Sequence, residues 1–132
     1  MRKSILTAMA LCLLPAFAAD ALARGAGSSA RVLGYPRGWA TILVDAQYLA
    51  ATSCQYIASM QRVAPAGASV PRRAVAVTVV VASRSGNCVR RPILLRDTTI
   101  VFPANDTWNV VVFFVTPSGK RLKTEQIPIL GL

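Results

Sequence analysis

Carboxylates are the residues of this chain that could carry out acid–base chemistry. The chain has 132 residues, with 15 Lys and Arg, 5 Asp and Glu, and no His. The absence of histidine excludes a Ser-His-Asp triad, a Cys-His pair and a His-ligated zinc site. Two carboxylates about 5–10 Å apart could still hydrolyse a glycoside, and the candidates are Asp45, Asp97, Asp106 and Glu125. Nothing in the sequence brings two of them together, so we expect no catalytic residue and keep a small acid-pair hydrolase as an alternative.

Arginine supplies most of the positive charge. It offers a planar fork of donors to carboxylates or phosphates and is weakly hydrated enough to lie in interfaces. Two clusters are candidate sites for an anion or a partner: Arg72 and Arg73, and Arg84, Arg90 and Arg91. If a strand runs between the clusters, they lie at its opposite ends, and they need not form one surface. The alternative is an ordinary basic surface that keeps the protein soluble and protects strand edges.

The N-terminal segment has the three parts of a secretory signal peptide. A short basic start precedes the apolar run 5–19, and small residues follow at 21–23. We expect cleavage between Ala23 and Arg24, with a second candidate site after Ala18. The run is shorter than a membrane-spanning helix, so no transmembrane segment is expected after cleavage. Removal of residues 1–23 leaves 13 cations and 4 anions, a net charge of +9.

The two cysteines beyond the leader predict a disulfide. Cys54 and Cys88 are separated by 34 positions, which does not match a Cys-x-x-Cys redox motif. An exported protein meets an oxidising compartment, where an even number of cysteines is normally paired. Two thiols without histidine or acidic partners form a poor metal site, and the chain has no phosphate-binding loop or dinucleotide fingerprint. We therefore expect neither a metal nor a cofactor.

The rest of the chain shows the pattern of strands. Residues 24–38 are rich in Gly and Arg and predict a flexible leader before a domain over 39–132. Apolar alternation and β-branched runs between turn signals predict six strands, at 39–50, 54–62, 74–81, 93–102, 108–115 and 121–127. The strand at 74–81 is apolar on both faces, as in the centre of a sheet. The strand at 93–102 is expected to be interrupted or bulged near Arg96 and Asp97. The more polar strand at 121–127 resembles an edge strand.

These strands predict an all-β fold, a small antiparallel β-sandwich of about six or seven strands with one disulfide. Immunoglobulin-like and transthyretin-like arrangements both fit the strand count. We expect a periplasmic or secreted, non-enzymatic module that binds an acidic protein or an anionic envelope polymer through its Arg-rich loops. One alternative is a subunit of a surface fibre or secretion assembly joined through strand edges.

We do not expect nucleic acid as a partner, because an exported protein leaves the compartment that contains it. In addition, no RNA-binding signature accompanies the positive charge. Tyr35, Arg37 and Trp39 nevertheless interleave aromatic and basic groups, which can stack on bases or sugars.

Overall fold

Seven β-strands make up nearly all the regular structure of residues 27–132, the part of the chain that the computed structural model describes. They are β1 (Ser29–Gly34), β2 (Thr41–Ala50), β3 (Gln55–Gln61), β4 (Ala74–Ser83), β5 (Ile93–Val101), β6 (Asn109–Val115) and β7 (Arg121–Leu130). A short 3-10 turn, η1 (Pro36–Gly38), joins β1 to β2. The all-β class and the six strands expected from the sequence are thus confirmed. The expected signal peptide lies outside the described residues, and within these residues no helix is long and apolar enough to span a membrane.

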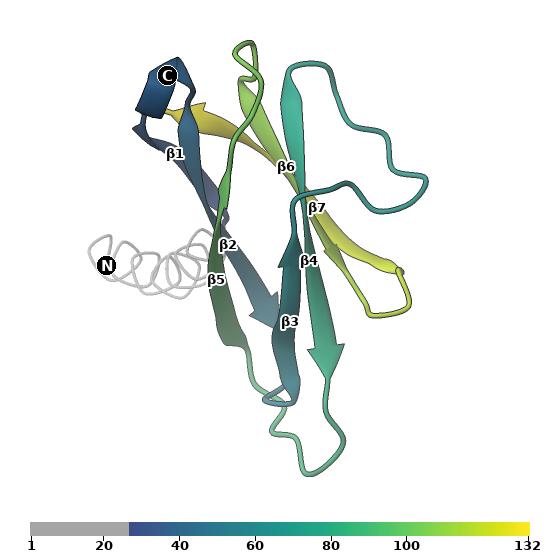
Figure 1. The fold of residues 1–132 in the computed structure, drawn as a ribbon. Coiled ribbons are helices and arrows are strands. Elements are labelled where there is room, and N and C mark those ends of the chain that lie inside the picture. Colours follow the sequence, from purple (N-terminus) through teal and green to yellow (C-terminus); the bar gives the residue numbers. More distant parts are fainter. Residues whose placement is uncertain (1–26) are drawn as a thin grey trace, which may run out of the picture.

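The strands form one mixed sheet in the order β3-β4-β6-β7-β1-β2-β5, which curls into a nearly closed barrel (Figure 1). The structure is thus barrel-like and not the β-sandwich that the sequence led us to expect. The expected antiparallel arrangement is also wrong at two places, because β4 and β6 pair in parallel, as do β1 and β7. The chain leaves β4, crosses to β5 on the other side of the barrel and returns to β6, so β6 runs in the same direction as β4. Strand spacing in the sequence does not contain this information, because it does not say which strands are neighbours.

The sequence predicted a flexible leader over 24–38, but the structure has a strand at residues 29–34. These residues form β1, which lies between β7 and β2 inside the sheet. Ala30 is buried and Val32 packs against the core, whereas Arg31 and Leu33 are exposed. This alternation is typical of a strand, but the surrounding Gly and Ser residues concealed it.

The barrel interior is filled by inward-facing aliphatic side chains and Phe114. Phe114 is fully buried, and its ring centroid lies 5.2 Å from that of Tyr48. A second apolar cluster covers the outer face of β4 and β6, where Val111 and Phe113 pack against Ala64 and Ala68 of the long β3–β4 connection. Two-sided burial explains why β4 and β6 are apolar at almost every position, as the sequence indicated for β4.

Two further details of the sequence-based picture are corrected. β5 pairs with β2 without interruption from Ile93 to Val101, so there is no bulge at Arg96 and Asp97. The two charged residues point to opposite faces of the strand, and Arg96 pairs with Asp45 on β2, so the ladder accommodates both. In addition, β7 is not an edge strand, because it lies between β6 and β1.

The edges of the sheet, β3 and β5, approach each other along a seam where the barrel is not closed by strand pairing. The predicted disulfide between Cys54 and Cys88 is confirmed, and it lies at one end of this seam. At the other end the guanidinium of Arg62 lies 5.9 Å from the ring centroid of Phe102. The barrel therefore has a disulfide end and an opposite end, formed by the β1–β2 and β5–β6 connections (Figure 1).

Candidate functional site

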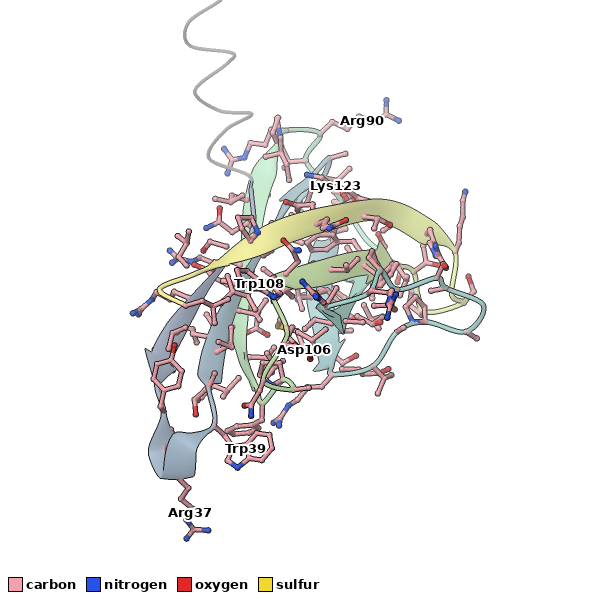
Figure 2. The ribbon with its side chains drawn as sticks, turned by 90° about the horizontal axis from the view of Figure 1, so that it is seen from above. Arg37, Trp39, Arg90, Asp106, Trp108 and Lys123 are labelled. Atoms are coloured by element: carbon pink, nitrogen blue, oxygen red, sulfur yellow. A yellow bond between two sulfur atoms is a disulfide. The ribbon has the colours of Figure 1, made fainter. Side chains whose placement is uncertain are left out.

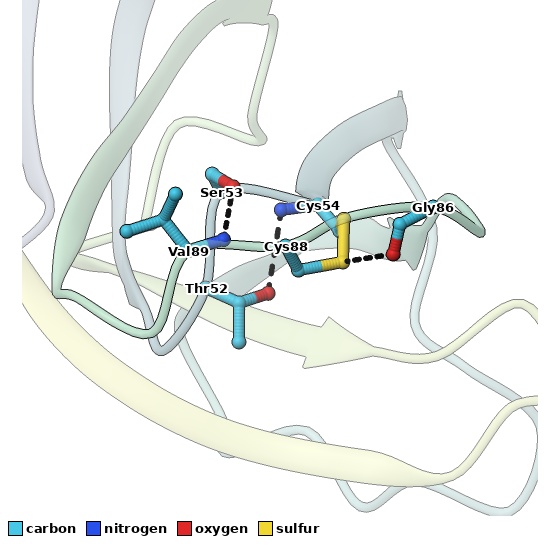
Figure 3. Close-up of a disulfide and its surroundings, with 6 residues drawn as sticks. All are labelled: Thr52, Ser53, Cys54, Gly86, Cys88 and Val89. Atoms are coloured by element: carbon cyan, nitrogen blue, oxygen red, sulfur yellow. Dashed lines mark hydrogen bonds between the residues drawn. A yellow bond between two sulfur atoms is a disulfide. The ribbon is translucent and has the colours of Figure 1, made fainter.

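The disulfide end is organised by a short network around Cys54 and Cys88 (Figure 3). The Cα atoms of the two cysteines are 5.3 Å apart. Beside them, the amide of Ser53 donates to the carbonyl of Val89 at 3.0 Å, and the amide of Val89 donates to Ser53 Oγ at 2.9 Å. The amide of Arg84 donates to the carbonyl of Cys54 at 3.0 Å. The β4–β5 loop is thus attached to the start of β3 by one covalent bond and three hydrogen bonds.

This loop carries three of the five predicted anion-binding arginines. Arg84 stacks over Tyr56, with its guanidinium carbon 4.8 Å from the ring centroid. Arg90 and Arg91 are exposed, and no carboxylate of residues 27–132 lies within ion-pair distance of either. We call the segment 84–91 the basic loop. Its free guanidinium groups can bind carboxylates, phosphates or sulfates, because Arg donors match these anions in pairs.

The other two candidates, Arg72 and Arg73, lie at the opposite end of the barrel. The ten residues of β4 separate them from the basic loop, about 30 Å at the usual rise of a strand. Arg73 adopts a positive φ of 60°, and its carbonyl accepts hydrogen bonds from the amides of Trp108 and Asn109 at 2.8 and 3.2 Å. Its main chain thereby aligns the start of β4 with β6. The five arginines do not form one surface.

The acidic candidates are also dispersed, beginning with Asp45 and Asp97 on neighbouring strands. Asp45 lies on the outward face of β2 and pairs with Arg96 at 2.6 Å. Asp97 is opposite the buried Ala46, so it lies on the other face of the sheet and accepts a hydrogen bond from the amide of Thr98. The hydrogen bond and the charge of Asp45 raise the pKa of Arg96 further above its ordinary value, so Arg96 stays protonated and cannot act as a base.

Glu125 and Asp106 lie on other elements than Asp45 and Asp97. Glu125 lies on β7, accepts hydrogen bonds from the amide and hydroxyl of Ser28 at 3.1 and 3.2 Å, and pairs with Lys123 at 3.5 Å. Asp106 is in the exposed β5–β6 turn. Within residues 27–132, no group of three or more Cys, Asp and Glu residues is arranged to hold a metal ion. Among the described residues, no two of the four carboxylates share a hydrogen-bond partner.

Sequence reasoning did not predict a cavity at the end opposite the disulfide. Its volume is about 270 Å³, and its wall is formed by Tyr35, Ala40, Pro103, Ala104, Asn105, Thr107, Trp108 and Leu132. We call it the mouth cavity. Figure 2 looks onto this end of the barrel and shows Trp39, Asp106 and Trp108 there, with Arg90 on the far side of the view.

Strand alternation could have indicated this cavity. Val110, Val112 and Phe114 face the interior of the barrel. Trp108 has the same parity but precedes the strand, so its side chain lies where the interior opens to solvent and remains 58% exposed. Ala40 stands in the same relation to the inward residues of β2. The aromatic residues Tyr35 and Trp39, which the sequence analysis already noted, lie in the β1–β2 connection.

Searches against protein-family models, curated proteins and solved structures give no match for this chain. The protein is therefore described from its structure alone, as a seven-stranded, disulfide-linked β domain of mixed topology.

Proposed function

We propose that this protein is an exported, periplasmic or secreted, non-enzymatic binding domain whose basic loop contacts an anionic polymer of the cell envelope. The observation that carries the proposal is the position of Arg90 and Arg91. Both are exposed next to a disulfide, on a loop attached to β3, and no described carboxylate neutralises them. A fixed loop loses little conformational entropy on binding.

An extended anion suits this surface better than a single acidic protein. Residues 27–132 contain 12 cations and 4 acids, and the cations occur at both ends of the barrel. A flexible polymer can follow such a dispersed charge, whereas a folded partner would need one complementary patch.

Assembly through strand edges has less support. The two edges, β3 and β5, face each other across the seam and are held near one end by the disulfide. An acid-pair hydrolase also has less support, because Asp45 and Asp97 point to opposite faces and Glu125 is engaged by Ser28 and Lys123.

The test measures the affinity of the oxidised, exported protein for dextran sulfate at low and high salt. The double variant Arg90→Glu/Arg91→Glu should reduce the affinity at low salt about tenfold or more, since two attractive contacts become repulsive. The matched control, Arg37→Glu/Arg72→Glu, makes the same change in net charge at the opposite end and should have a smaller effect. Equal losses in the two double variants would show that net charge, and not the basic loop, is responsible. Strong binding only to an acidic protein would favour the other partner class.

A further inference from the structure

The mouth cavity differs in chemistry from the rest of the surface. All eight side chains that form its wall are uncharged, although the described part of the protein has a net charge of +8. Tyr35 and Trp108 present aromatic surface, and both side chains are more than half exposed. Asn105 adds an amide that can both donate and accept hydrogen bonds. We propose that the mouth cavity binds a sugar ring of a neutral glycan.

The aromatic wall is held in place before any ligand arrives. The amide of Trp108 donates to the carbonyl of Arg73 at 2.8 Å, and the carbonyl of Trp108 accepts from the amide of Ile129 at 3.0 Å. The turn before it is closed by a hydrogen bond from the amide of Thr107 to the carbonyl of Ala104 at 3.1 Å. In the β1–β2 connection, the Tyr35 hydroxyl donates to the carbonyl of Gly131 at 3.5 Å. A prearranged main chain reduces the entropy lost when the site is filled.

A sugar ring matches this combination of surfaces. Its C–H face is apolar and stacks on an aromatic face, whereas its hydroxyl groups need donors and acceptors at the edge of the site. Tyrosine and tryptophan are suited to such places because each combines an apolar body with a polar group. Asn105 also lines the cavity, and its amide can form a hydrogen bond with a sugar hydroxyl.

The absence of charged side chains from the wall disfavours anionic ligands at this site. A nucleotide, a phosphate or an acidic peptide would be expected to contact cations, and the cavity side chains provide none. A volume of about 270 Å³ is slightly below the usual range for drug-sized ligands, so one ring of a longer chain fits better than a large compact ligand. The mouth of a β-barrel is also a common place for such sites.

The test is isothermal titration of the full exported protein with cellotetraose, chitotetraose and maltotetraose. We expect at least one of them to bind, with an affinity that does not change between low and high salt. Trp108→Ala should weaken this binding about tenfold or more, because base and sugar stacking on aromatic side chains depends on the ring. Trp108→Tyr should retain most of it. Asn105→Ala, which leaves the aromatic wall unchanged, should also weaken it.

Trp39→Ala is the matched control. Trp39 is 55% exposed, close to the value for Trp108, and it lies at the same end of the barrel without lining the cavity. This variant should bind as the original protein does. The proposal is overturned if none of the three oligosaccharides binds, or if Trp108→Ala and Trp39→Ala lose binding equally. It is also overturned if a neutral peptide rich in proline and aromatic residues binds at Trp108 while the sugars do not. These outcomes are separate from the dextran sulfate experiment, since they do not involve the basic loop.

Discussion

Glu125 is an acidic side chain with a structural role. It lies on β7 just before the point where β1 becomes its neighbour, and it accepts both donors of Ser28. The hydroxyl of Ser28 in turn accepts from the amide of Gln47 on β2 at 3.0 Å. Glu125 and Ser28 therefore connect β7 to β2 where β1 has not yet begun.

At this position, Glu125→Ala should lower the free energy of unfolding by about 2 kcal/mol, because the amide and hydroxyl of Ser28 lose a charged acceptor in a half-buried place. Glu125→Gln keeps an acceptor oxygen, so its effect should be about 1 kcal/mol. Urea unfolding measured by circular dichroism checks both values. Asp97→Ala is the control, since its exposed carboxylate accepts only from the adjacent amide of Thr98, and a loss as large as that of Glu125→Ala would contradict this account.

Among the elements, β3 and β5 depend on the disulfide more than any other pair of strands. Each has a hydrogen-bonded neighbour on one side only. Cys54 lies just before β3 and Cys88 lies in the loop that leads to β5, so the disulfide and the Ser53–Val89 hydrogen bonds hold this loop against the start of β3. The disulfide consequently limits how far the two edge strands can separate at this end.

Replacing both cysteines with alanine should reduce the free energy of unfolding by about 4 kcal/mol, because the unfolded chain regains the entropy of an open loop of 34 positions. Chemical unfolding of the oxidised protein, the reduced protein and the double variant measures this loss. Hydrogen exchange should show the largest increase at the amides of β3 and β5. A uniform increase over all seven strands would mean that the disulfide does not act on the seam in particular.

The sequence was sufficient to locate six strands, because β4 and β6 have strong β-branched runs and the turns between strands contain Pro, Gly and Asn. It was not sufficient to order them. The parallel pairs β4–β6 and β1–β7 arise from crossings over the barrel, and nothing local distinguishes a strand with a parallel neighbour from one with an antiparallel neighbour. β1 was missed because its period-two pattern is only six residues long and lies among small residues.

The candidate sites differ in how far the sequence predicts them. The disulfide followed from counting cysteines, and the separation of the two arginine clusters followed from the length of the strand between them. For the mouth cavity, strand alternation could have indicated the positions of Trp108 and Ala40, but not that Tyr35 and Asn105 join them. These two residues come from connections that are distant in the sequence and meet only when the barrel forms.

At the scale of the described molecule, the two candidate sites lie at different ends of the barrel. The basic loop lies at the disulfide end, and the mouth cavity, whose side chains are uncharged, lies at the other, about the length of a ten-residue strand away. Sites this far apart, with no shared residue, are expected to act independently.

Binding measurements on the two sets of variants can test this independence. Arg90→Glu/Arg91→Glu should leave the oligosaccharide affinity unchanged, and Trp108→Ala should leave the dextran sulfate affinity unchanged, each within about twofold. Titration calorimetry for the sugar and salt-dependent retention for the polymer provide the two measurements. If either variant weakened the binding of both ligands, the two sites would have to belong to one continuous binding surface.

The parallel pairing of β1 and β7 has a mechanical consequence. The chain enters β1 near the disulfide end and leaves β7 at the opposite end, and the two strands are side by side, in register at Ala30–Ile129 and Arg31–Leu130. Tension applied to the segments before β1 and after β7 therefore pulls the two strands past each other along their length. The hydrogen bonds and packing between them must yield together, and not one after another as in an opening hairpin. A domain built in this way resists tension applied through the segments that flank β1 and β7.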